Sequence, residues 1–136
     1  MDPKHATEWN QLLAQEGYRP ELAVYEDKPT HCRLRFKAEG RTYLAYLDEA
    51  DTTFAHLELA YKVREGRDLG TLVRLANGVN ALLKGAKMMV DREADVVRFH
   101  LEWFLEGVPP LRVIERSLSQ LVSAASAFFD RLAESR

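Results

Sequence analysis

Residues 31–48 read HCRLRFKAEGRTYLAYLD and carry the clearest pattern in the 136-residue chain. Through residues 31–37, apolar side chains alternate with basic ones, which is the period of a strand with one buried and one wet face. The sequence AEG at 38–40 is typical of a hairpin turn, and residues 41–48 then form the returning strand. The stretch predicts an antiparallel hairpin whose buried face holds Cys32, Leu34 and Phe36.

Alternation outside this hairpin predicts the rest of the sheet. We expect further strands at residues 22–25, 53–63, 87–91 and 96–105. Residues 53–63 are also compatible in part with a helix, so the pattern leaves strand or helix open there. The last two strands form a second hairpin around residues 92–95.

Three helices are predicted from apolar stripes and end signals. The first covers residues 7–16, with Thr7 as its cap. The second follows the cap Asp68 and reaches residue 84, where Gly85 ends it. The third covers residues 111–132, with an apolar stripe at spacings of three and four. That spacing also suits a coiled coil, but the width of the stripe favours a helix lying across a sheet.

The elements together predict a single α+β domain over residues 1–136. Its order is α-β-β-β(-β)-α-β-β-α, with five to six antiparallel strands. Since each good strand has only one apolar face, the three helices should pack mainly on one side of the sheet.

Composition sets further limits. The chain has 19 basic and 21 acidic residues and 46% hydrophobic residues, which excludes intrinsic disorder and gives no sign of a polyanion as main partner. No apolar run is long enough for a membrane helix, and the first residues lack the pattern of a signal peptide. With Cys32 as its one cysteine, the protein is expected in the reducing cytoplasm.

No set of residues predicts catalysis. The five serines all fall in the last helix or just after it, on what we expect to be its solvent side. Cys32 and His31 are strand neighbours that point to opposite faces, so they cannot act as a nucleophile and base. His31, His56 and His100 could share the wet face, where adjacent strands would allow a weak metal site. We predict a protein without enzymatic activity, cofactor or metal.

Aromatic side chains on the wet face are the candidate partner-binding residues. Phe54 and Phe104 fall opposite the core in their strands. In residues 41–48 either Tyr43 or Tyr46 is exposed, and Tyr46 is the one we assign to the site. A contiguous apolar patch would indicate a partner surface. The alternative is a nucleic-acid-associated regulator that uses the basic strand His31–Lys37, although cross-strand pairing with acids such as Glu58 and Glu102 is the favoured role of that strand.

Five short segments in a fixed order carry a family resemblance. They are Glu16-Gly17-Tyr18-Arg19-Pro20, Tyr43-Leu44-Ala45-Tyr46-Leu47-Asp48, Leu75-Ala76-Asn77-Gly78-Val79-Asn80, Ala86-Lys87-Met88-Met89-Val90-Asp91 and Ser123-Ala124-Ala125-Ser126-Ala127-Phe128-Phe129. The set resembles the YbjN family, small bacterial proteins with the type III secretion chaperone-like fold, over nearly the whole chain.

The resemblance implies a helix-flanked antiparallel sheet, a homodimer and a chaperone-like or regulatory role. Relatives in secretion systems bind a largely unfolded segment of another protein and are not enzymes. Secretion chaperones are strongly acidic, whereas this chain has a pI near 6.1, which speaks against a role in secretion. Asn77 and Asn80 lie on one helical face, where we expect them to bridge backbone groups as a structural pair.

Overall fold

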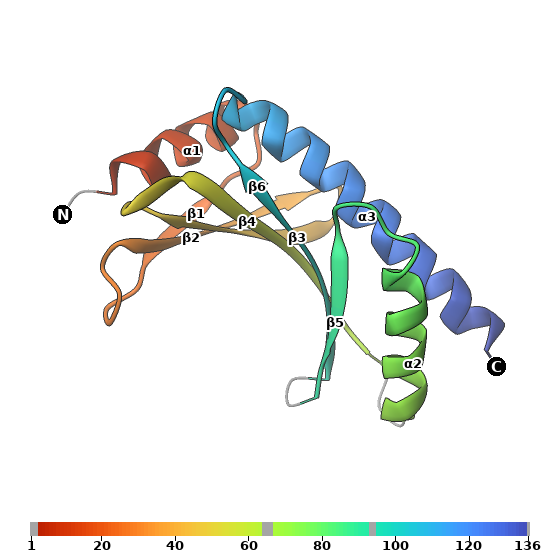
Figure 1. Cartoon of the computed structure of the whole chain (residues 1–136). Coiled ribbons are helices and arrows are strands. Elements are labelled where there is room, and N and C mark those ends of the chain that lie inside the picture. Colours follow the sequence, from red (N-terminus) through yellow and green to blue (C-terminus); the bar gives the residue numbers. More distant parts are fainter. Residues whose placement is uncertain (1–2, 64–66, 93–94, 136) are drawn as a thin grey trace.

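The computed structural model describes residues 3–63, 67–92 and 95–135 and contains one sheet and three helices (Figure 1). The helices are α1 (Lys4–Gln15), α2 (Leu69–Asn80) and α3 (Pro110–Glu134). The strands are β1 (Glu21–Val24), β2 (His31–Ala38), β3 (Arg41–Asp48), β4 (Asp51–Lys62), β5 (Lys87–Asp91) and β6 (Val96–Phe104). The predicted α+β class and element order are confirmed.

The six strands form one antiparallel sheet in the order β1-β2-β3-β4-β6-β5. The open question about residues 53–63 is settled as strand, because β4 pairs with β3 on one side and β6 on the other. The pairing of β3 with β4 is interrupted after Leu47, since Asp48 opposite Asp51 follows Leu47 opposite Ala55. The predicted turn at 92–95 includes residues 93–94, which lie outside the described residues.

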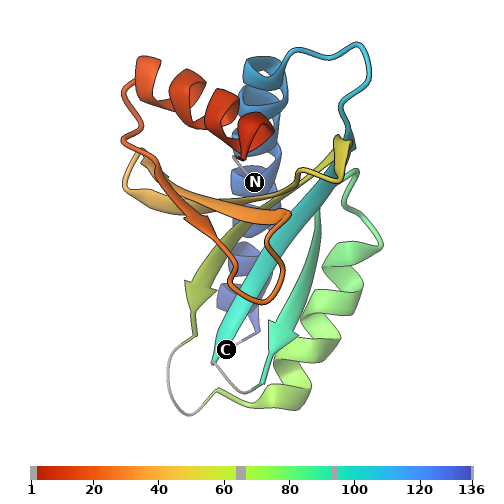
Figure 2. The same ribbon diagram turned by 90° about the vertical axis from the view of Figure 1, so that its left-hand side faces the viewer.

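All three helices lie on the same side of the sheet (Figures 1 and 2). α3 crosses the convex side of the curved sheet, and the long helix is therefore a sheet-packing helix rather than part of a coiled coil. Its buried side includes Ile114, Leu121 and Phe128, which are fully inaccessible to solvent. They pack with Cys32, Leu34 and Phe36 in one continuous core.

The first helix begins earlier than the sequence indicated. Pro3 stands at its N-cap, and no side chain caps it. The N–H of Thr7 donates to the carbonyl of Pro3 at 2.8 Å, so Thr7 lies inside the first turn and the predicted Thr7 cap is wrong. The carboxylate of Glu49, from the β3–β4 turn, instead accepts hydrogen bonds from the N–H groups of His5 and Ala6. A residue distant in sequence therefore accepts the hydrogen bonds of free N–H groups that a local N-cap side chain would otherwise accept.

The second helix has the predicted start but ends early. Asp68 accepts from the N–H of Thr71 at 3.2 Å, as expected of an N-cap. The helix ends at Asn80 rather than at residue 84, because the side chain of Asn80 bonds to the backbone of Met88 on β5. Gly85, at φ +76°, belongs to the connection that follows, so the prediction that it ends the helix is wrong.

Ser117 corrects the expectation that the serines of the last helix face solvent. It is fully buried, and its Oγ accepts a hydrogen bond of 2.8 Å from Nε1 of Trp103 on β6. Ser119, Ser123 and Ser126 are exposed as predicted.

Among the described residues, no helix combines the length and the hydrophobicity that a membrane span requires.

Candidate functional site

The face of the sheet turned away from the helices is the candidate site, and we call it the open face (Figure 2). It exists because each central strand alternates, so that only every second side chain enters the core. Its central side chains come from β2, β3, β4 and β6. They are Arg33, Tyr46, Phe54, His56, Glu58, Arg98, His100, Glu102 and Phe104.

The three predicted partner-binding aromatics all lie on the open face. Phe54 and Phe104 are opposite each other on β4 and β6, with ring centroids 5.4 Å apart in an edge-to-face arrangement. Phe104 is 75% exposed, the highest value among the large hydrophobic side chains of the described residues. Tyr46 is half-buried on the same face, whereas Tyr43 is only 2% exposed and belongs to the core. The uncertainty between the two tyrosines is thereby removed.

A buried carboxylate in the middle of the open face was not predicted. Glu58 is only 8% exposed, and its Oε2 accepts from Nη1 of Arg98 at 3.3 Å and from the hydroxyl of Tyr46 at 3.4 Å. Arg98 also donates to Asp91 at 3.1 Å, so it joins two acids. The expected pairing of Glu58 and Glu102 with the basic strand is wrong, because Glu58 pairs with Arg98 and Glu102 with His56 at 3.4 Å.

Two histidines lie stacked beside this network. The rings of His56 and His100 are 5.4 Å apart and nearly parallel. Burial, helped by His56, lowers the pKa of His100. Burial next to Glu58 raises the pKa of Tyr46 to about 12, so its hydroxyl keeps its proton as a hydrogen-bond donor. His31 is separate and lies 3.7 Å from Asp48. Within residues 3–63, 67–92 and 95–135, no three metal-binding side chains are close enough to hold a metal.

The basic strand is partly neutralised by acids next to it. Arg35 lies 3.7 Å from Glu21 on β1, and His31 faces Asp48 on β3. Arg33 lies opposite Tyr46 and has no carboxylate of the described residues within ion-pair distance. The row is therefore a mixed surface rather than a continuous cationic stripe.

A small pocket opens on this face where the pairing of β3 and β4 is interrupted. Its volume is about 220 Å³. Tyr46 and Phe54, two of the predicted partner-binding residues, both line it. The remaining lining residues are Tyr25, His31, Cys32, Leu47, Asp48, Asp51 and His56. Sequence reasoning missed it because it depends on the register of three strands.

Cys32 has the surroundings of a core residue. It is 1% exposed, and burial together with the charges of Glu49 and Asp48 raises the pKa of its thiol. A raised pKa reduces the thiolate fraction, which is the opposite of what a nucleophile needs.

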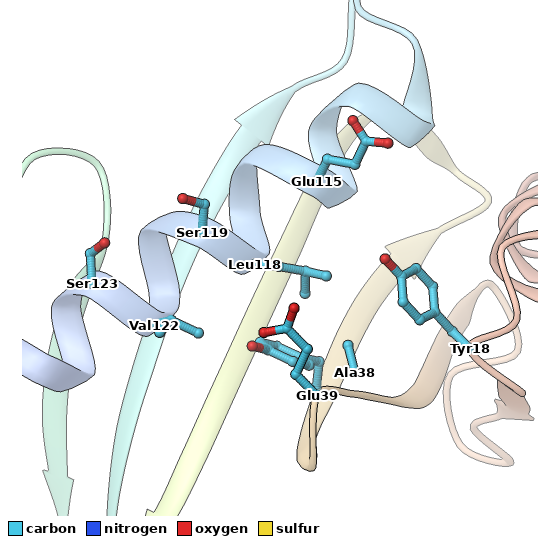
Figure 3. A pocket seen from close by; sticks show the side chains of 9 residues that line it. Tyr18, Ala38, Glu39, Glu115, Leu118, Ser119, Val122 and Ser123 are labelled. Atoms are coloured by element: carbon cyan, nitrogen blue, oxygen red, sulfur yellow. The ribbon is translucent and has the colours of Figure 1, made fainter.

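A larger cavity of about 490 Å³ lies on the helix side of the sheet (Figure 3). Figure 3 shows Leu118 and Val122 pointing from α3 toward the end of the β2–β3 hairpin, with Tyr18 on another wall. Glu39 and Glu115 are exposed acids at this cavity, and neither forms a hydrogen bond with a serine of the described residues that could activate it. The open face, with its exposed aromatic side chains, is therefore the better candidate for a binding site.

A family model described as "Putative bacterial sensory transduction regulator" matches residues 7–134. The chain belongs to the YbjN family. As a YbjN protein it shares a family description that names a regulator.

Two solved structures share the fold of this YbjN chain. One is an uncharacterized protein from Methanothermobacter thermautotrophicus, with 13% identity, a TM-score of 0.67 and 98% of each chain covered. The other is YbjN of E. coli, described as "a putative transcription regulator", with 14% identity, a TM-score of 0.61, and 96% of this chain and 93% of that chain covered. At such identities the likeness shows the fold alone. No curated protein matches the sequence.

Proposed function

We propose that this YbjN protein is a non-enzymatic regulatory domain that binds a peptide segment of another protein on its open face. In this proposal the binding unit is a homodimer, as the resemblance to secretion-chaperone-like proteins implies. The occupant is an extended segment that places an apolar side chain against Phe104 and Phe54.

The observation that carries the proposal is the exposure of Phe104. Phe104 is 75% exposed and in ring contact with Phe54, so this pair leaves apolar surface in contact with water. Covering apolar surface favours association, and binding energy concentrates in a few buried aromatic anchors. Tyr46 and the pocket adjoin this anchor, so one segment can contact all of them.

An open edge of the sheet lies next to the same surface. β1 is a short edge strand, and Val24 and Tyr25 at its end are 46% and 37% exposed. An edge strand offers unpaired backbone groups, to which an extended segment can add as a further strand. Tyr25 also lines the pocket, so a segment added at β1 would run beside it.

Nucleic acid is the second candidate ligand, through Arg33, Arg35 and Lys37 on β2. The observation in its favour is that Arg33 has no acidic partner among the described residues. The E. coli neighbour is described as "a putative transcription regulator". The pairing of Arg35 with Glu21 weakens the case. A gel-shift assay at low salt with mixed DNA and RNA tests it, since binding through phosphates produces a shift that disappears as salt is raised.

Site-specific photo-crosslinking tests the peptide-binding proposal. A benzophenone amino acid replaces Phe104 in the full chain, and cells producing the protein are irradiated. We expect crosslinks to one identified protein, mapped by mass spectrometry to a single segment of it. Crosslinks to nothing, to many unrelated proteins, or to nucleic acid would contradict the proposal.

The matched control replaces Leu82, which is 66% exposed just beyond α2 and away from the open face. We expect no crosslink from this position to the same segment. Equal crosslinking from both positions would show non-specific contact and contradict a binding site on the open face.

Sedimentation velocity tests the homodimer separately. We expect the mass of two chains, where one chain is 15.6 kDa. A monomer over the full concentration range would remove the homodimer from the proposal and leave the peptide-binding surface to be judged by the crosslinks.

A further inference from the structure

The pocket on the open face combines rings with acids. Of the nine described residues that line it, five carry rings and two are aspartates. The rings are those of Tyr25, His31, Tyr46, Phe54 and His56. At about 220 Å³ the pocket falls below the roughly 300–1,000 Å³ of sites for whole small molecules. Its size suits one long side chain of a larger ligand.

We propose that this pocket binds the guanidinium group of an arginine in the partner segment. The inference deepens the proposed function and rests on it, since the arginine belongs to the segment that the open face holds.

The rings favour a cation of this kind. A cation over the face of an aromatic ring is attracted by the negative charge of that face, and a guanidinium also stacks on rings because it is planar and weakly hydrated. Tyr46 and His56 stand edge to face with centroids 5.4 Å apart, which gives the pocket two differently oriented ring walls. An ammonium group is more strongly hydrated and would lose more on entering such a site.

The two aspartates supply the complementary charge. Oδ1 of Asp51 accepts hydrogen bonds from both the N–H and the hydroxyl of Thr53. Oδ1 of Asp48 accepts a hydrogen bond from the N–H of Ala50. These bonds hold the carboxylates in place and leave Oδ2 of Asp51 without a hydrogen bond or ion pair among the described residues. Oδ2 of Asp48 lies at ion-pair distance, 3.7 Å, from Nε2 of His31, and a guanidinium would compete with His31 for this oxygen. A guanidinium has five donors to satisfy both oxygens.

No arginine of the described residues fills the site. Arg33 lies opposite Tyr46 on β2 but is not among the lining residues, and Arg35 is paired with Glu21. Of the described residues that line the pocket, none is a lysine or an arginine. We therefore assign the arginine to the partner segment.

An NMR titration with a matched pair of probes tests this. The probes are N-acetyl-arginine methylamide and N-acetyl-citrulline methylamide, which differ in charge but hardly in shape. We expect the arginine probe to shift the amide signals of Tyr46, Phe54 and His56 and to saturate in the millimolar range. The citrulline probe should bind at least about tenfold more weakly, and equal binding of the two probes, or no saturable binding of either, would overturn the inference.

Charge-matched variants identify the site. Asp48→Asn with Asp51→Asn should lose at least about tenfold in affinity for the arginine probe. The control, Glu115→Gln with Asp130→Asn, removes the same charge from exposed positions on α3 and should change the affinity by less than about twofold. Similar losses in both variants would mean that net charge alone attracts the probe, and would overturn the site. The amide spectra of both variants check that they fold.

The two proposals can fail separately. A crosslinked segment that binds through Phe104, together with equal binding of the arginine and citrulline probes, would remove the arginine site and keep the peptide-binding function. Selective binding of the arginine probe without any crosslinked segment would remove the function and leave a cation site without its peptide context.

Discussion

The amide side chain of Asn80 bonds twice to the backbone of Met88. Its Nδ2 donates to the carbonyl at 2.9 Å, and its Oδ1 accepts from the N–H at 2.8 Å. The last residue of α2 thus pairs with the edge strand β5 as a neighbouring strand would. This contact ties the helix to the sheet, whereas Asn77, one turn earlier, is exposed.

Asn80→Ala should lower the free energy of unfolding by about 1–3 kcal/mol, because it leaves a backbone N–H and a carbonyl of β5 without partners. Asn77→Ala, its matched control, should change it by less than about 0.5 kcal/mol. Urea denaturation measures both. Equal effects of the two substitutions would contradict the role assigned to the Asn80 contact.

Ser117→Ala should lower the free energy of unfolding by about 1 kcal/mol, since the indole N–H of Trp103 loses its acceptor. Ser119→Ala, at an exposed position on the same helix, should be neutral within about 0.5 kcal/mol. Thermal unfolding of the two variants decides the point, and a neutral Ser117→Ala would show that the bond contributes nothing.

Glu58→Ala should cost about 2 kcal/mol, because Tyr46 and Arg98 both lose a buried acceptor. Adding Arg98→Met should cost less than the sum of the single effects, with a coupling of at least about 0.5 kcal/mol. A double-mutant cycle in urea measures this coupling. Strict additivity would mean that the two side chains do not interact in solution.

Because of His100, the free energy of unfolding should fall as the pH drops below about 6.5. Burial and His56 lower its pKa from the ordinary 6.5, although Glu58 and Glu102 oppose this. Lys87 is its neighbour on β5. As the pH falls, His100 therefore takes up its proton in the unfolded chain before it does so in the folded one. The contribution of His100 to stability is fully present above pH 6.5 and is lost between that value and the lower pKa of the folded state.

The substitution His100→Gln should flatten this decline. Unfolding free energies of the two proteins between about pH 7 and pH 5 test the prediction. A steeper decline in the variant than in the wild type would contradict the direction of the shift.

Much of the fold is predictable from local pattern. Alternation places the strands within one or two residues, and β3 and β5 have the predicted bounds. The sheet-packing role of α3 follows from the width of its stripe. These features depend on the strand period of two residues and the helix period of 3.6 residues, which the local sequence shows directly.

The failures share one cause, which is contact between distant residues. The carboxylate of Glu49 accepts a hydrogen bond from the backbone at the start of α1. The side chain of Asn80, at the end of α2, bonds to the backbone of β5. Ser117 is buried because Trp103 reaches it from β6. Glu58 looks like a wet-face residue in its own strand and is covered only when Tyr46 and Arg98 are brought beside it. The alternation of apolar and polar residues identifies the aromatic candidates. Predicting the pocket that Tyr46 and Phe54 line would require the register of three strands.

The affinity of the crosslinked segment for the purified protein is the most direct test of the open face as a binding surface. Fluorescence anisotropy of a labelled synthetic peptide measures it. Phe54→Ala with Phe104→Ala should weaken binding at least about tenfold, while Leu82→Ala, which removes another exposed apolar side chain, should leave it within about twofold. Unchanged affinity in the Phe54→Ala/Phe104→Ala variant would contradict the account.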